Sequence, residues 1–155
     1  MDLKKFMKKT GVTKKKYVDK WIDDDLIPGA VRKDGVYSFP ESARRPYRGG
    51  NLKAGLSADK IRAHIVKAAI LRHHISANSC HMSAGEFSAM ITDLANADLI
   101  QIRVEDGVTY YDSTQKTRDY AKKSLHELGR FVQDCLKSLA EGATTAAINA
   151  SAVGK

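Results

Sequence analysis

The stretch WIDDDLIPGAVRKDGVYSFP, residues 21–40, organises the first third of the chain. Asp34-Gly35 is a residue pair that favours a two-residue turn, so the flanking AVRK and VYSF are predicted to form a β-hairpin that ends at Pro40. Before the hairpin stand three consecutive acids, Asp23–Asp25. Asp25 is expected to end a helix by taking the left-handed conformation that usually belongs to glycine. A lysine-rich helix that ends in three acids raises the question of what those acids do.

The residues before this stretch predict two short helices. Leu3, Phe6 and Met7 follow helical spacing, which indicates a helix over residues 2–9 that stops at Thr10-Gly11. Thr13 is expected to cap the second helix through its hydroxyl group. The apolar stripe of that second helix consists of Tyr17, Val18, Trp21 and Ile22.

Composition is that of an ordinary globular chain. Its 155 residues suit one compact domain or two very small ones plus a helix, with 43% hydrophobic and 28% charged residues. We find no apolar run near the ~20 residues of a membrane span, and the lysine-containing N-terminus has no apolar signal region. Cys80 and Cys135 are expected to be free thiols. These features predict a cytoplasmic protein that makes no membrane contact.

Positive charge is concentrated at the start of the chain. The formal net charge is +8, and residues 1–50 hold 13 Lys and Arg against 7 Asp and Glu. Nucleic acid, an acidic protein or a membrane surface are each suitable partners for such a segment, and charge selected for solubility alone is the alternative.

The second segment repeats the order helix, helix, hairpin. Ser57 is expected to cap a helix over about 58–74, and Ser83 with Glu86 forms a capping box for the next helix. Asp106-Gly107 then predicts a hairpin turn. The fold class predicted from these patterns is mainly α with small β-hairpin wings: two winged helix-turn-helix-like modules over 1–50 and 55–113, separated by NLKAG at 51–55, plus a C-terminal helix.

The predicted C-terminal helix, residues 115–141, carries an apolar stripe with steps of four and three. Its members are Ala121, Leu125, Leu128, Val132, Cys135 and Leu139. Such a stripe must be buried, either against its own module or against a second copy of the chain. We favour pairing, because two-fold dimers are common among soluble proteins. Residues 142–155 are predicted to be a flexible tail.

Residues 1–50 resemble the winged helix-turn-helix of the MerR and excisionase families, especially the small versions from phages and mobile elements. The resemblance rests on LKKFMKKTGV at 3–12, WIDDDLIP at 21–28 and VYSFPESARRPY at 36–47. It implies that the N-terminal half of the second helix enters the major groove of double-stranded DNA and that the hairpin lies against phosphate or the minor groove. The acids would then lie ~10–15 Å further along the helix, where their repulsion is largely screened.

The residues that this arrangement places against DNA are mostly cationic. Tyr17 is either a phosphate contact or a core residue, and we favour the core because aromatic residues at helical spacing usually pack. The predicted DNA-binding residues are Thr13, Lys14, Lys15, Lys16, Tyr17, Lys20, Arg32, Lys33, Arg44, Arg45 and Arg48.

No catalytic or metal motif is evident in the sequence. His73, His74, Cys80 and His81 are possible zinc ligands, but their spacing matches no standard zinc pattern and a polar loop explains them better. We therefore expect no enzyme activity, no metal and no cofactor.

The sequence thus favours a sequence-specific double-stranded DNA-binding protein, a transcription regulator or recombination accessory factor of a phage or mobile element, acting as a homodimer. The second predicted recognition helix carries acids instead of cations, so the second module is expected to be structural or to bind a partner. The alternative is that residues 55–141 bind and inhibit a host protein, with the first module serving autoregulation.

Overall fold

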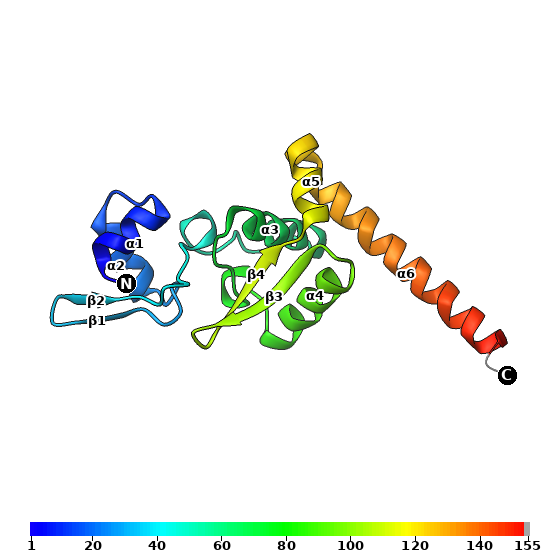
Figure 1. The fold of residues 1–155 in the computed structure, drawn as a ribbon, viewed down its shortest axis with the longest axis horizontal. Coiled ribbons are helices and arrows are strands. Elements are labelled where there is room, and N and C mark those ends of the chain that lie inside the picture. The colour runs from blue at the N-terminus through cyan, green and yellow to red at the C-terminus, as the bar shows by residue number, and fades with distance from the viewer. Residues whose placement is uncertain (154–155) are drawn as a thin grey trace.

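The computed structural model describes the backbone of residues 1–153 and the side chains of residues 1–141. The fold is mainly helical, with two antiparallel two-stranded hairpins in the described part. The helices are α1 (Leu3–Thr10), α2 (Lys15–Asp23), α3 (Ala58–Leu71), α4 (Ala84–Asn96), α5 (Gln115–Ser124) and α6 (Leu128–Val153). The strands are β1 (Val31–Lys33), β2 (Val36–Ser38), β3 (Ile100–Glu105) and β4 (Val108–Ser113), and single turns of 3-10 helix lie at Tyr47–Gly49, Asn78–Cys80 and Leu125–Glu127. In Figure 1 the helices α1 and α2 with their hairpin stand beside the larger group formed by α3, α4 and the second hairpin.

The first module, residues 1–43, has its own small core. Phe6 from α1 stacks on Phe39 after β2, with ring centroids 4.2 Å apart. Val18 and Trp21 from α2 complete this core with Ile27. The two helices therefore converge on Phe39, because each contributes one apolar side, as helical spacing requires.

The two ends of α2 differ in how well the sequence predicts them. Thr13 is not the N-cap: Lys14 occupies that position in extended conformation, with no capping side-chain hydrogen bond, and α2 begins at Lys15. The predicted role of Asp25 is confirmed, since its φ is 56°. The Leu26 N–H donates to the Trp21 carbonyl at 2.8 Å, a bond that closes the helix through a left-handed residue.

The first hairpin matches its prediction closely. Asp34 and Gly35 both have positive φ, 53° and 77°, as the favoured two-residue turn requires. Val31 pairs with Ser38 and Lys33 with Val36. All residues of β1 are exposed, so this hairpin projects into solvent as a thin ribbon (Figure 1).

The second module, whose core begins at Tyr47, shows the predicted order of helix, helix and hairpin. Ser57 and Ser83 cap α3 and α4 as expected, each accepting from the N–H three residues on. The helix α3 ends at Leu71, three residues before the predicted end at 74, because Arg72 takes a left-handed φ of 58°. Its core centres on α3, α4 and the start of β3, with Ile65 and Leu94 fully buried.

The boundary between the modules lies earlier than the predicted segment 51–55. Tyr47 and Leu52 are both buried in the second core. Leu52 is held there by its N–H, which donates to the Ser79 carbonyl at 2.8 Å. From the first module, the Trp21 Nε1–H donates to the Gly49 carbonyl at 3.1 Å. The Gly-Gly stretch is therefore hydrogen-bonded to the first module at Gly49 and flanked by two residues of the second core.

The predicted C-terminal helix is interrupted. Ser124 has a non-helical backbone (φ −159°, ψ 78°), and the chain changes direction there between α5 and α6. Tyr120 and Phe131 stack across this bend with centroids 3.9 Å apart. The end of α6 extends away from the second module (Figure 1).

The structure contradicts the prediction that the apolar stripe of the C-terminal helix forms a dimer interface. Leu128 and Val132, its central members, are 4% and 0% exposed within the chain itself, in the core that α3 shares. Cys135 packs against the same core, and Leu125 and Leu139 are exposed at the two ends. The six residues Ala121, Leu125, Leu128, Val132, Cys135 and Leu139 therefore do not form one continuous surface for a second copy. The centre of the stripe is buried by folding back onto its own module, the option that we did not favour.

Residues 142–153 continue α6 as backbone helix, where the sequence analysis predicts a tail over 142–155. Residues 154–155 lie outside the described part. No helix within residues 1–153 combines the length and apolar composition that crossing a membrane needs.

Truncation of Leu128 tests this packing. We expect Leu128→Ala to lower the free energy of unfolding by about 2–5 kcal/mol, because it removes a buried side chain. Leu125→Ala, at a position that is 44% exposed, should cost about 0.5 kcal/mol or less. Urea unfolding at two protein concentrations measures both. A midpoint that rises with protein concentration in the wild type, but not in Leu128→Ala, would contradict the intramolecular packing.

Candidate nucleic-acid interface

The helix α2 presents three different sides. Its buried side carries Val18 and Trp21. A second side faces the first hairpin and carries Lys15, Asp19 and Asp23, at steps of four. The remaining outer side carries exposed Lys16 and Lys20. The sequence therefore separates apolar, paired and unpaired charged residues around one nine-residue helix.

The acids of α2 hold the hairpin in place. Arg32 on β1 donates to Asp19 at 3.0 Å and to Asp23 at 2.5 Å. Tyr37 on β2 donates to the same Asp19 at 2.6 Å. Lys15 lies 3.8 Å from Asp19 and 5.4 Å from the centroid of the Tyr37 ring. Two of the acids in α2 thus serve as partners for hairpin residues.

This arrangement corrects two predictions. Arg32 is not a free cation for DNA, because two carboxylates already bind its guanidinium group. The sequence predicts that Asp23 is tolerated because it lies far from the basic surface. In the structure its charge is compensated by Arg32. Asp24 and Asp25 are exposed at the end of the helix. The hydrogen bond from Tyr37, followed by that from Arg32, holds the pKa of Asp19 below its ordinary value.

Four predicted DNA-binding lysines remain uncompensated. Lys14, Lys16 and Lys20 on α2 and Lys33 at the hairpin turn are exposed. None of the four has an ion-pair partner among residues 1–141. Unpaired positive charge therefore lies at the start of α2, on its outer side and at the turn of the first hairpin.

A pocket of about 460 Å³ lies beside this outer side. We call it the Trp21 pocket; its polar and aromatic lining residues are Thr13, Tyr17, Lys20, Trp21, Arg45 and Arg48. The guanidinium of Arg45 lies over the Trp21 ring, 5.5 Å from its centroid. No acid is among the residues that line it. Cations beside aromatic faces and a hydroxyl group suit an anionic ligand that carries a flat ring or a sugar.

Tyr17 belongs to this surface and not to the core. Its side chain is 47% exposed, so the interpretation that we favoured from spacing is wrong. Lys16 lies near its ring, 5.4 Å from the centroid. The structure thus brings five predicted residues together in the Trp21 pocket: Thr13, Tyr17, Lys20, Arg45 and Arg48.

Arg44 has a different role from the predicted one. Its guanidinium binds the carboxylate of Asp112 on β4, donates to the Tyr111 carbonyl at 3.3 Å and lies 4.9 Å from the Tyr110 ring centroid. Its side chain is only 10% exposed. Arg44 therefore joins the two modules and is not available to DNA.

The histidine and cysteine residues of segment 73–81 are dispersed. His74 is largely buried against Tyr110, and burial followed by the charge of Arg44 lowers its pKa to about 4. Burial raises the pKa of Cys80 to about 12, and the His81 Nε2 lies 2.7 Å from the Leu52 carbonyl oxygen. Within the described residues, no group of three or more His, Cys, Asp and Glu side chains is placed to hold a metal ion.

Sequence reasoning missed the residues that shape the interface without belonging to it. Asp19 and Tyr37 orient the hairpin, and the Gly49 carbonyl anchors Trp21. The four-residue step from Lys15 to Asp19 was a usable signal for a pair on one side of α2. The Tyr37 contact lies across 18 residues and has no local signal.

Comparison with known proteins finds no match to a family model, a curated protein or a solved structure.

The Asp19 tether predicts a dependence on pH. Because its pKa is lowered in the folded chain, the tether contributes stability above the ordinary aspartate value and loses it as the pH falls through the lowered value. We therefore expect the β1–β2 amides to lose protection from hydrogen exchange on acidification. Asp19→Asn should show this loss already at neutral pH.

Asp24→Asn is the matched control for this experiment, since Asp24 has no ion pair among residues 1–141. It should leave hairpin protection unchanged. Equal protection in the wild type and in Asp19→Asn would show that the tether does not hold the hairpin.

Proposed function

We propose that the first module binds double-stranded DNA, with the start and outer side of α2 in the major groove and the first hairpin acting as a wing. The observation that carries the proposal is the unpaired charge of Lys14 at the start of α2 and of Lys16 and Lys20 on its outer side. Asp19 and Asp23, by contrast, are engaged by Arg32. A helix whose outer side is cationic is the usual element that enters the major groove.

The dimensions of α2 are compatible with this role. The diameter of an α-helix with its side chains is about 10–12 Å, which fits the major groove, ~12 Å wide. Lysine side chains bind phosphate oxygens and make affinity depend on salt, without specifying bases. Thr13 and Tyr17 can form hydrogen bonds with either bases or phosphates.

The flanks of the interface extend the basic track. Lys33 projects at the tip of the wing, and Arg48 lines the Trp21 pocket on the opposite flank. The resemblance of segments 3–12, 21–28 and 36–47 to MerR and excisionase modules supports the same docking. It further supports a role as a transcription regulator or recombination accessory factor of a mobile element. The proposal involves no chemical reaction and needs only one copy of the chain.

The second module does not share these properties. Its helix α4 exposes Glu86 and Asp93, which would repel phosphate. A specific observation favours a second function for it, namely binding of a protein. Ile102 and Val104 on β3 are 50% and 67% exposed, beside an apolar groove of about 590 Å³ that Phe87 and Ile91 help to line.

Val104→Ser should weaken binding of a protein partner to the second module and leave DNA affinity unchanged.

Removal of the unpaired lysines tests DNA binding. Lys16→Ala/Lys20→Ala should weaken binding to a duplex uniformly across sequences and reduce the slope of log K against log salt by about 2, because two phosphate contacts are lost. Fluorescence anisotropy at several salt concentrations measures this slope.

The matched control is Lys53→Ala/Lys67→Ala, which removes the same charge from exposed positions of the second module. It should retain the wild-type slope. An unchanged slope in the α2 variant, with the fold intact, would exclude this side of α2 as the interface.

A further inference from the structure

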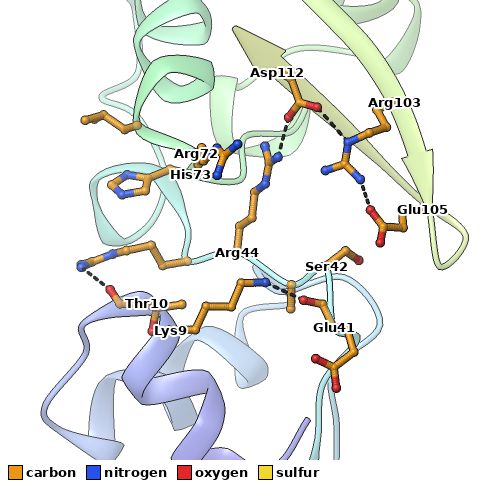
Figure 2. A pocket seen from close by; sticks show the side chains of 13 residues that line it. Lys9, Thr10, Glu41, Ser42, Arg44, Arg72, His73, Arg103, Glu105 and Asp112 are labelled. Atoms are coloured by element: carbon orange, nitrogen blue, oxygen red, sulfur yellow. Dashed lines mark hydrogen bonds and ion pairs between the residues drawn. The ribbon is translucent and has the colours of Figure 1, made fainter.

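A second basic site lies between the two modules. It is a cavity of about 580 Å³, bounded by the end of α1 in the first module and by the end of α3 and both strands of the second hairpin. Figure 2 shows side chains from these elements around a common space, with Lys9 below and Arg72 and His73 above it. The cavity belongs to neither module alone.

The acids that line the cavity are already paired. Asp112 binds both Arg44 and Arg103, and Glu105 binds Arg103 as well. Glu41 also lines the cavity, and its carboxylate lies 3.2 Å from Lys5, a residue that is not part of the lining. The negative charges of this space are therefore compensated by named cations (Figure 2).

Two arginines of the lining are not compensated. Arg45 and Arg72 have no acidic partner among residues 1–141; the only hydrogen bond from the Arg45 side chain goes to the Thr10 carbonyl at 3.5 Å. The Nε of Arg45 and the Nδ1 of His73 are buried from solvent without any hydrogen-bond partner in the described residues. Buried polar atoms usually have a partner, so these two nitrogens indicate a ligand-binding position.

The titration of the neighbouring groups agrees with this picture. Burial, followed by the positive charge of Arg45, lowers the pKa of His73. Burial, followed by the positive charge of Arg44, lowers the pKa of Lys9. The protein thus crowds cations around one space, and a bound anion would relieve that repulsion.

We propose that a phosphate group binds in this cavity between Arg45, Arg72 and His73. Guanidinium groups bind phosphate oxygens through paired N–H donors, and a protonated imidazole supplies a further donor. The cavity is larger than a single phosphate ion, so the group belongs to a larger molecule: the DNA backbone or a small phosphorylated compound.

The site goes beyond the proposed role of α2, because it requires Arg72 and His73 of the second module. Arg45 connects the two, since it lines both this cavity and the Trp21 pocket. A DNA backbone that leaves α2 past Arg45 would continue onto the second module. A small phosphorylated compound would instead link the two modules in the absence of DNA.

The experiment follows the imidazole resonance of His73 in the full chain by NMR, assigned by its loss in His73→Gln. Its pKa is measured in chloride, in inorganic phosphate at matched ionic strength, and with a DNA duplex. We expect inorganic phosphate, the duplex or both to raise the pKa of His73 toward its ordinary value. A rise of the His73 pKa with inorganic phosphate identifies a site for the phosphate group of a small phosphorylated compound, and a rise with the duplex alone identifies the DNA backbone.

Arg72→Gln should abolish the rise in the His73 pKa, since a charge-assisted contact is lost. It should also weaken binding of the probe that raised this pKa about tenfold or more. Lys67→Gln, which removes the same charge from α3 outside the cavity lining, should behave as the wild type. Arg72→Gly, which suits the left-handed φ of 58°, replaces Arg72→Gln if the latter unfolds.

The proposal would be overturned if neither probe raised the pKa of His73. It would also be overturned if the pKa still rose in both Arg72 variants. Duplex binding that depends on Lys16 and Lys20, together with a His73 pKa that neither the duplex nor inorganic phosphate changes, would retain the proposed function of α2 and reject this site.

Discussion

The guanidinium group of Arg44 crosses from the end of the first module into the second, where Asp112, the Tyr111 carbonyl and the Tyr110 ring surround it. Removing one partner from such a mostly buried pair leaves an uncompensated charge. Close by, the Ser42 hydroxyl lies 2.8 Å from both the Asp106 carboxylate and the Tyr110 hydroxyl. These contacts set the position of one module on the other. The Arg45–Arg72 cavity exists only because of that position.

The acidic residues of this basic chain serve mainly as internal partners. Asp19 and Asp23 are bound to Arg32, Glu41 to Lys5, and Asp112 to Arg44 and Arg103. Each pair compensates a cation, and the unpaired cations include those of α2, Lys14, Lys16 and Lys20, and Arg45 and Arg72 of the cavity. The three acids that follow the lysine-rich helix thus have two uses: Asp23 steadies the hairpin, and Asp25 ends the helix.

Much of the local structure was predictable because short-range physics decides it. The Asp34-Gly35 turn, the caps Ser57 and Ser83 and the left-handed Asp25 each depend on a few neighbouring residues. The candidate site was predictable as a segment, since Lys14, Lys16, Lys20 and Lys33 are exposed as expected. Thr13 shows the limit of such rules, because a suitable capping residue was one position too early for the helix that forms.

By itself the sequence determined the order of elements, their turns and caps, and the concentration of positive charge in the first fifty residues. Only the tertiary structure decided which charges remain free, since Arg32 and Arg44 find their acids 9 and 68 residues away. It alone decided that Leu128 and Val132 are buried within the chain and that Tyr17 lies at the surface. The physical reason is that helical spacing shows which residues share one side of a helix, but not which distant element covers that side.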